Sequence, residues 1–209
     1  IVNRSGLPPL LLEKQRGGTL TPIEQEQWVS GTSICAGDFD NDLRPDLAIL
    51  TNEGITICFN SGQRNEWMVP DAKNFHTIIP VDFDNDGWLD LWTIGDTIQA
   101  WRNRGLSGFK DQTAKLGLDA FNDGPVSEIH FADFDHDCDS DVIVALSDGG
   151  LRYFENDGGN ANAQIKVQMV GNRSNASGLG CKIVIETGGL RLIRTVHQLP
   201  VEVGMGNHQ

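Results

Sequence analysis

Short stretches in which apolar and polar residues alternate recur along the chain and predict β-strands. Three acidic stretches interrupt this pattern, and each is preceded by an alternating run and followed by a short apolar run. The preceding strands are expected at residues 32–36, 75–80 and 127–132, the following strands at 47–50, 91–94 and 142–146, and a third set at 55–60, 97–103 and 151–156. Because a period of two residues is typical of strands with one buried face, we expect an all-β fold.

The acidic stretches divide residues 1–156 into repeats of similar length. They begin at residues 38, 82 and 133, and each repeat closes on an asparagine at the end of its third strand: Asn60, Asn103 and Asn156. Repeats of about 40–50 residues with several short strands are typical of β-propeller blades. Residues 1–6 have the pattern of the end of an earlier repeat, with Asn3 at the closing position. We therefore expect a partial propeller of three blades plus a remnant, which is either a piece of a longer protein or is completed by blades from elsewhere.

Each acidic stretch predicts a metal-binding loop. The second loop, residues 82–90, has carboxylates at positions 1, 3, 5 and 9, a glycine at position 6 and the Trp88 carbonyl at position 7. The loops at residues 38–46 and 133–141 keep the four carboxylates, with Arg44 and Asp139 at position 7. The candidate carboxylate ligands are Asp38, Asp40, Asp42, Asp46, Asp82, Asp84, Asp86, Asp90, Asp133, Asp135, Asp137 and Asp141.

Alternate side chains of a tightly wound loop point inward, so the carboxylates of each loop are expected to converge on one point. Six to eight oxygen ligands suit a hard cation, with Ca²⁺ as the first choice and Mg²⁺ as a poorer one. An ordinary acidic turn is the alternative, since Asp and Asn favour turns. Three copies with the same carboxylates and the same Phe at position 2 (Phe39, Phe83 and Phe134) favour the metal site. We expect up to three structural Ca²⁺ ions.

The loops differ at position 6, where the backbone has to turn sharply. Gly87 of the second loop is replaced by Leu43 in the first loop and by Cys138 in the third. A side chain at such a turn is expected to strain the backbone, because left-handed conformations favour glycine. The second loop is therefore predicted to bind Ca²⁺ most tightly, within a range on the order of 10⁻⁵ to 10⁻³ M for loops of this kind.

The charge of the chain limits its possible partners. The formal net charge is −13, and the three loops hold 12 of the 29 acidic residues. Such an acidic chain is a poor candidate for binding nucleic acid or anionic membranes. No apolar run approaches the roughly 18 residues needed to span a bilayer, so we expect no direct membrane insertion. The four cysteines lack C-x-x-C spacing; buried free thiols are the expectation and disulfides the alternative.

Residues 160–209 have a different pattern and predict a separate small β domain. They contain no acidic loop, and strands are expected at 164–170, 181–186 and 190–197, the last two joined by a turn at Gly188-Gly189. Before the first blade, residues 7–20 are expected to be a loop. Thr21-Pro22-Ile23-Glu24 then predicts the start of a short helix that ends near Trp28. Residues 108–118 predict a connector with one helical turn.

The Phe-Asp-x-Asp loops on this period resemble the FG-GAP/VCBS repeats of integrin α-chain propellers and many bacterial surface proteins. Residues 170–183 are similar to the pattern G-x-x-S-N-R-x-G-I-G-A-x-V of the ASPIC/UnbV domain, which follows such repeats in the cartilage acidic protein-like family. Cys181 stands where this family usually has alanine. Residues 108–118 also resemble the family pattern G-x-F-x-D-x-T-x-x-A-G-L. The resemblance implies an extracellular Ca²⁺-stabilised propeller with interaction roles and no known reaction.

Two functions are compatible with these patterns. The first is a non-enzymatic calcium-binding protein in adhesion, protein–protein interaction or assembly, whose partner is a protein, the extracellular matrix or a cell-surface component. Weak loops of this kind fill only where Ca²⁺ is abundant, which favours an extracellular, cell-surface or periplasmic location. The alternative is a propeller-based lyase or hydrolase whose active site lies in blades missing from this chain. No G-x-S-x-G, P-loop or dinucleotide-binding fingerprint is present, so we expect no catalytic residues here.

Overall fold

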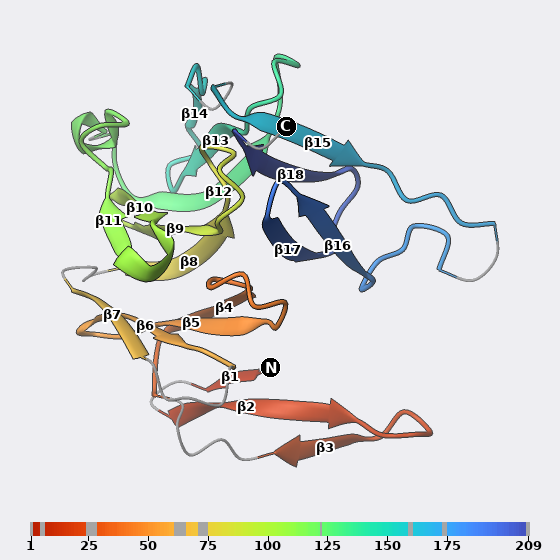
Figure 1. Ribbon diagram of the computed structural model, residues 1–209. Helices are drawn as coiled ribbons and strands as arrows, with labels where there is room; N and C mark the ends of the chain where they lie inside the picture. Colours follow the sequence, from red (N-terminus) through yellow and green to blue (C-terminus); the bar gives the residue numbers. More distant parts are fainter. Residues whose placement is uncertain are drawn as a thin grey trace.

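The structure of the protein, a computed structural model, is built almost entirely from β-strands (Figure 1). It describes residues 2–4, 7–23, 29–60, 66–70, 75–121, 123–158, 161–172 and 175–207. These ranges contain antiparallel sheets and two short 3-10 helices, η1 (Gly105–Ser107) and η2 (Leu118–Ala120), but no α-helix. No helix in these ranges is long and apolar enough to cross a membrane. The all-β prediction is confirmed.

The first two repeats form four-stranded sheets in which the strands follow one another in sequence order. The first sheet contains β4 (Ser33–Gly37), β5 (Asp46–Leu50), β6 (Gly54–Cys58) and β7 (Glu66–Pro70). The second sheet contains β8 (Phe75–Val81), β9 (Asp90–Gly95), β10 (Ile98–Asn103) and β11 (Phe109–Asp111). The first three strands of each sheet confirm the predicted pattern. The fourth strands were not predicted, and β11 lies in the expected connector.

The third repeat forms a sheet of β12 (Val126–Ala132), β13 (Asp141–Leu146) and β14 (Leu151–Phe154). Within the part of the chain that the structure describes, no fourth strand pairs with β14. Figure 1 shows the three sheets following one another in chain order, from β4–β7 through β8–β11 to β12–β14. The array is open, which agrees with a partial propeller.

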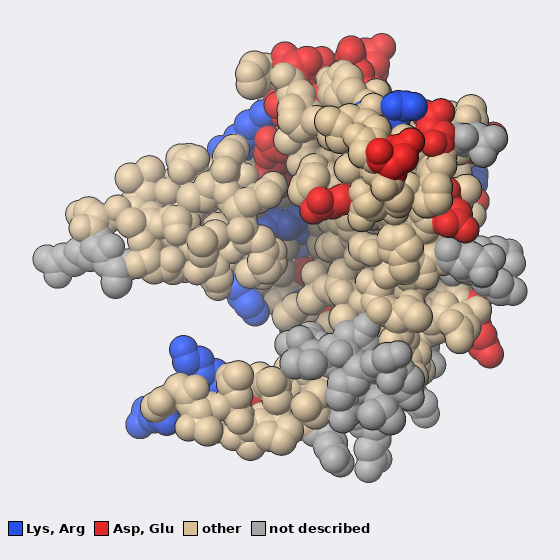
Figure 2. Space-filling view, turned by 180° about the vertical axis from the view of Figure 1, so that it is seen from behind, with Lys and Arg blue, Asp and Glu red and all other residues tan. Residues whose placement is uncertain are grey.

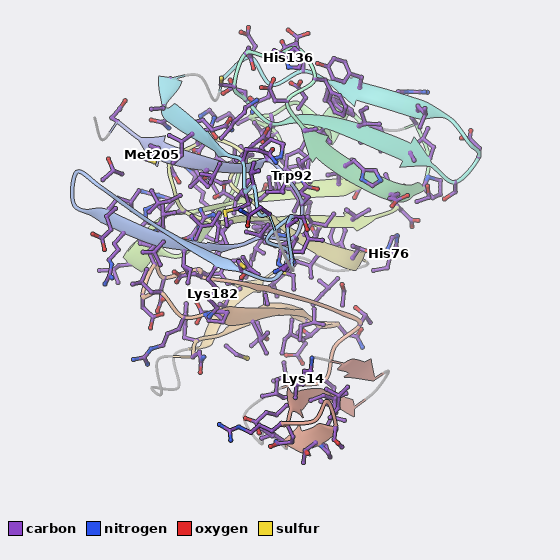
Figure 3. All side chains as sticks on the ribbon, turned by 90° about the vertical axis from the view of Figure 1, so that its right-hand side faces the viewer. Lys14, His76, Trp92, His136, Lys182 and Met205 are labelled. Atoms are coloured by element: carbon purple, nitrogen blue, oxygen red, sulfur yellow. The ribbon has the colours of Figure 1, made fainter. Side chains whose placement is uncertain are left out.

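Side chains from neighbouring sheets meet in two apolar clusters. One cluster joins the first and second sheets and includes Phe39, Ile57 and Trp101. The other joins the second and third sheets and includes Trp92 and Val144. Figure 3 shows Trp92 in the interior of the molecule, where it is 4% exposed. Each sheet therefore buries its apolar face against the next sheet, as the layers of a blade array require.

The N-terminal residues form a further sheet of β1 (Val2–Arg4), β2 (Leu7–Lys14) and β3 (Leu20–Ile23). The predicted helix start at Thr21 is wrong, because Thr21 lies in β3 and pairs with Glu13 of β2. Gly17 and Gly18, with φ of 99° and 90°, form the turn of this hairpin. Cross-strand pairing therefore outweighs the local capping pattern, and β2 occupies much of the predicted loop. Residues 24–28, where the helix was expected to end, lie outside the described residues.

Four strands near the C-terminus form what we call the C-terminal module, residues 161–207. Strand β15 (Ala163–Val167) pairs with β18 (Val201–Gly206), and β16 (Lys182–Thr187) pairs with β17 (Leu190–Thr195). Leu192, Val196 and Val203 are buried in its own small core. The hairpin at Gly188-Gly189 is confirmed, whereas β18 lies beyond the predicted strands. The module lies beside the stacked sheets and not at the end of the stack (Figure 1).

Candidate metal centres

Each acidic loop connects the first and second strands of its sheet, so the sheet holds both ends of the loop. Loop 1 (residues 38–46) follows β4, loop 2 (82–90) follows β8 and loop 3 (133–141) follows β12. In every loop, ligand atoms of three carboxylates lie within 4.8 Å of one another. These sets are Asp38, Asp40 and Asp42 in loop 1, Asp82, Asp84 and Asp86 in loop 2, and Asp133, Asp135 and Asp141 in loop 3. The structure thus brings together the carboxylates at positions 1 and 3 in all three loops.

Backbone hydrogen bonds give the three loops a common shape. The amide at position 6 donates to the carboxylate at position 1: Leu43 to Asp38 at 3.0 Å, Gly87 to Asp82 at 3.1 Å and Cys138 to Asp133 at 3.2 Å. Position 6 has a positive φ in every loop, 72° at Leu43, 87° at Gly87 and 77° at Cys138. This conformation costs a residue with a side chain about 1–2 kcal/mol, so the predicted strain is present in loops 1 and 3.

The cysteine of loop 3 departs from the sequence expectation in one respect. All four cysteines are free thiols, as expected. Cys58 is buried, but Cys138 is exposed at the tip of its loop. The neighbouring His136 also lies at the surface, at the upper edge of Figure 3. The tip of loop 3 is therefore open to solvent.

The carboxylate at position 9 is engaged by the backbone of its own repeat. Asp90 accepts one hydrogen bond from the Phe83 amide at 3.2 Å and another from the Asn103 amide at 2.7 Å. Asp46 and Asp141 accept the equivalent two bonds in their repeats. Asp46 and Asp90 lie outside the three-carboxylate sets of their loops, whereas Asp141 belongs to the set of loop 3. Position 9 therefore fastens each loop to the third strand of its sheet.

The residues at position 7 also hold the loops in shape. Their amides donate to the carboxylate at position 5: Arg44 to Asp42 at 2.8 Å, Trp88 to Asp86 at 2.9 Å and Asp139 to Asp137 at 2.9 Å. Asp137 lies outside the three-carboxylate set of loop 3. The Asp139 side chain is fully buried and accepts a hydrogen bond at 2.9 Å from Asn85 of loop 2. This carboxylate therefore links two loops.

Three buried carboxylate oxygens have no hydrogen-bond partner among the described residues: Asp82 Oδ1, Asp84 Oδ1 and Asp133 Oδ1. The Oδ2 atoms of the same carboxylates face backbone amides or basic side chains. An unpaired buried carboxylate oxygen is costly, and a bound hard cation would satisfy it. The sets contain oxygen donors only, which fits Ca²⁺ and fits the smaller, stricter Mg²⁺ less well.

Burial raises the pKa of several loop carboxylates. The pKa of Asp38 rises to about 6, and those of Asp46 and Asp82 rise to about 7. The pKa of Asp90, which is fully buried, lies well above its usual value. At Asp133 the effect of burial is outweighed by the hydrogen bond and charge of Lys166 together with backbone hydrogen bonds, so the pKa of that carboxyl is lowered. Positive charge beside the loops favours the ionised carboxylates.

Basic side chains supply such charge at loops 2 and 3. Arg194 on β17 lies 3.7 Å from Asp82, and Lys166 on β15 pairs with Asp133. Arg102 on β10 forms ion pairs at 2.6 and 2.9 Å with two further carboxylates of loop 2, Asp84 and Asp86. Figure 2 shows acidic side chains gathered on the blades, with basic side chains along the border with the C-terminal module. These three residues were not predicted, because no local pattern marks a basic residue that reaches a loop in another part of the chain.

The closing asparagines connect neighbouring sheets. The side chain of Asn103 is fully buried and donates to the Phe39 carbonyl of loop 1 at 2.8 Å and to the Leu89 carbonyl at 3.0 Å. Asn156 repeats this contact one sheet further on, donating to the Phe83 carbonyl of loop 2 at 2.8 Å. Each of these asparagines therefore ties its own sheet to the acidic loop of the preceding sheet.

Comparisons with known proteins bear on the blades. The FG-GAP-like repeat matches twice, over residues 38–93 and 82–144, and the two matches together span more than half of the chain. A comparison with curated proteins gives no match. Among solved structures, a lectin from Agrocybe aegerita, described as recognising non-reducing terminal N-acetylglucosamine, is 13% identical with a TM-score of 0.46. That alignment covers 88% of this chain and 60% of the lectin chain, so the chain spans less than two thirds of the lectin's length.

The two repeat matches begin at the first aspartates of loops 1 and 2 and end in β9 of the second sheet and β13 of the third, so together they cover the three carboxylate sets. The resemblance of the C-terminal module to the ASPIC/UnbV domain stays a prediction. The repeated loops, the stacked sheets and the two matches agree with one another: the chain belongs to the FG-GAP-like repeat family.

Proposed function

We propose that this chain is a calcium-binding, non-enzymatic propeller-type module that acts in adhesion, protein–protein interaction or assembly outside the cytoplasm. The observation that carries the proposal is the recurrence of one carboxylate arrangement in three loops, with ligand atoms within 4.8 Å. In loops 2 and 3 the unpartnered oxygens of Asp82, Asp84 and Asp133 favour a cation site over an ordinary acidic turn.

Calcium in these loops would be structural. When bound, it would neutralise the clustered carboxylates and supply ligand bonds to oxygens that otherwise lack partners. The protein contributes the backbone amides that orient these carboxylates and the strands that hold both ends of each loop. Because the unfolded chain cannot preserve this arrangement, binding free energy adds to the free energy of unfolding.

The interaction role is supported by the family and by the surface of the third sheet. FG-GAP-like repeats form propeller-like folds of an adhesion or protein-interaction type. Leu151, Tyr153 and Phe134 are 66%, 48% and 44% exposed on the third repeat. Exposed apolar side chains that cluster in this way are typical of surfaces that bind another protein. We infer a protein, a matrix component or a cell-surface component as the partner, with the ASPIC/UnbV-like module as part of the assembly.

Thermal unfolding in millimolar Ca²⁺, in Mg²⁺ and in EDTA tests the metal assignment. At Ca²⁺ about 100-fold above the dissociation constant, one occupied site raises the melting temperature of a chain this size by roughly 5–10 °C. Asp86→Ala should reduce the rise. The control is Asp96→Ala, an exposed aspartate in the turn between β9 and β10. Equal melting temperatures of the wild type in Ca²⁺ and EDTA would contradict the proposal.

Location and partner binding need their own measurements. Fractionation of cells that make the protein naturally should place it in the medium, at the cell surface or in the periplasm, and an entirely cytoplasmic pool would contradict that location. Binding to extracellular matrix or cell-surface fractions should require Ca²⁺ and fall in a Tyr153→Glu variant. Equal binding by wild type and variant would remove the third sheet as the interaction surface.

A further inference from the structure

The C-terminal module docks directly on loop 2. The Gly206 amide donates to the Asn85 carbonyl at 2.8 Å, and the Gln164 side chain donates to the Asn85 side chain at 3.1 Å. Asn162 donates to the Asp84 carbonyl at 2.7 Å. These contacts join one end of the β15–β18 pair, where Ala163 pairs with Gly206, to two successive positions of the same acidic loop. Loop 2 is therefore a docking platform as well as a candidate metal centre.

The two surfaces approach closely, and each has a glycine at the contact. A Cβ atom at Gly204 of β18 would lie 2.4 Å from the Asn85 backbone and 2.5 Å from Asp82 Oδ2. A Cβ atom at Gly87 would lie 2.5 Å from the Leu190 side chain. Contact with the module thus gives a second reason, besides the positive φ, for a glycine at position 6 of loop 2. Loops 1 and 3 tolerate Leu or Cys at that position despite the same positive φ.

Arg194 is the charged group of this contact. It is 8% exposed, its guanidinium donates to the Gly87 carbonyl at 3.2 Å, and it lies 3.7 Å from Asp82 Oδ2. Both Asp82 and Arg194 line a cavity of about 560 Å³ between the blades and the module. A buried positive charge beside a carboxylate ligand opposes the entry of a cation, and the low dielectric of the site strengthens that effect.

The three loops differ in the basic side chains that face them. Loop 2 has Arg194 and also Arg102, and loop 3 has Lys166. The positions equivalent to Arg102, directly before the closing asparagine, hold Phe59 in the first repeat and Glu155 in the third. Among the ion pairs of the described residues, none links a basic side chain to loop 1, and the charge of Arg194 acts on Asp38 of loop 1 less strongly than on Asp82. The charge pattern therefore predicts a higher Ca²⁺ affinity for loop 1 than for loop 2, the opposite of the order that Gly87 alone predicts.

We propose that the C-terminal module sets the calcium affinity of loop 2 through Arg194. Loop 2 therefore binds Ca²⁺ more weakly than loop 1, and Ca²⁺ bound at loop 2 weakens the docking of the module. The inference rests on the proposed function, because it concerns the regulation of the same metal sites. Coupling of this kind is reciprocal: if docking weakens the metal site, occupancy of the metal site weakens docking by the same factor.

Trp88 at position 7 provides a probe specific to loop 2, because the equivalent residues of loops 1 and 3 are Arg44 and Asp139. Terbium ions, which occupy oxygen-rich calcium sites, emit when an adjacent tryptophan is excited, and added Ca²⁺ displaces them. Trp88→Phe identifies the part of the signal that comes from loop 2. Calorimetric titration of the same protein with Ca²⁺ reports all sites together.

The decisive comparison is between wild type, Arg194→Met and Arg191→Met. Arg191 is the matched control: it lies on the same strand, is 59% exposed at its side chain and pairs with Glu186 away from the loops. Arg194→Met should tighten Ca²⁺ binding at loop 2 by about tenfold, as expected for removing a nearby unit charge from a partly buried site. Arg191→Met should leave it unchanged.

The outcomes separate this inference from the proposed function. Wild-type protein that binds no Ca²⁺ at all contradicts the proposed function. Suppose that the wild type binds Ca²⁺ but Arg194→Met leaves the affinity of loop 2 unchanged or weakens it. That result overturns the inference and leaves the proposed function standing. Arg194→Lys, which keeps the charge, should resemble the wild type.

Hydrogen exchange on the wild-type protein gives a test that does not depend on the stability of a variant. The Gly206 amide, which donates to the Asn85 carbonyl of loop 2, should exchange faster in saturating Ca²⁺ than in EDTA. Amides inside the β2–β3 hairpin serve as the internal reference, since no hydrogen bond or ion pair of the described residues joins that hairpin to an acidic loop. Slower exchange of Gly206 relative to this reference would show that Ca²⁺ strengthens docking and would overturn the inference.

Discussion

Replacing Asn103 with alanine is expected to lower the free energy of unfolding by about 3 kcal/mol, because three hydrogen bonds at roughly 1 kcal/mol each are lost. The Asn103 side chain is fully buried and donates to the carbonyls of Phe39 and Leu89. It also accepts a hydrogen bond from the Gly105 amide at 3.0 Å. Alanine would leave these backbone groups without partners at the junction of the first and second sheets.

The other two closing asparagines provide matched comparisons at the same repeat position. Asn156 makes the three equivalent hydrogen bonds, but it is only partly buried and two of them are longer, so Asn156→Ala should cost about 1–2 kcal/mol. Asn60 is exposed, and its backbone amide, which alanine keeps, donates to Asp46. Asn60→Ala should therefore change the stability by less than about 0.5 kcal/mol.

Urea unfolding followed by tryptophan fluorescence measures the three variants under one condition. The account requires the order Asn103, Asn156, Asn60 from the largest loss to the smallest, with unchanged m-values. Equal losses for Asn60→Ala and Asn103→Ala would refute the reasoning, because the asparagine would then act within its own repeat and not between sheets.

Two further predictions concern the loops. Gly87→Ala should lower the melting temperature, because the added Cβ meets the Leu190 side chain at 2.5 Å. Cys138→Gly should raise the melting temperature, because it relieves a positive φ at a residue with a side chain. Equal shifts of the melting temperature in the two variants would contradict the close packing at loop 2. The raised pKa values of Asp46 and Asp82 mean that the metal-free fold binds more protons than the unfolded chain between pH about 4 and about 7. The free energy of unfolding in EDTA should therefore fall as the pH rises through this window, and Ca²⁺ at pH 8 should restore it. Urea unfolding at pH 5 and pH 8, with EDTA and with Ca²⁺, measures both effects. A free energy of unfolding in EDTA that rises toward pH 8 would contradict the raised pKa values.

The repeated part of the chain was predictable because its signals are local. Alternation defines the strands around each loop, and Asp82, Asp84 and Asp86 are close together in space because they are close together in sequence. The strained turns at Leu43 and Cys138 also follow from the comparison of three aligned loops. Repetition makes such local signals reliable, because each repeat confirms the others.

The remaining features depend on contacts between distant residues. Thr21 has a good capping pattern, but the pairing of β3 with β2 decides its conformation. Arg194 lies 107 residues from Gly87, whose carbonyl it contacts, so no local motif could connect them. Asp139 occupies position 7 of its own loop in the sequence, yet its carboxylate is buried against Asn85 of another loop. These are consequences of how the sheets and the C-terminal module dock.

The most direct test of the central claim is a crystal structure of the protein grown in millimolar Ca²⁺, with anomalous scattering used to locate the ions. The account predicts an anomalous peak within each carboxylate set, with ligand oxygens about 2.3–2.6 Å from the ion. The peak in loop 1 should have the highest occupancy at limiting Ca²⁺, in keeping with the two arginines that face loop 2. Loops without ions at saturating Ca²⁺ would contradict the account.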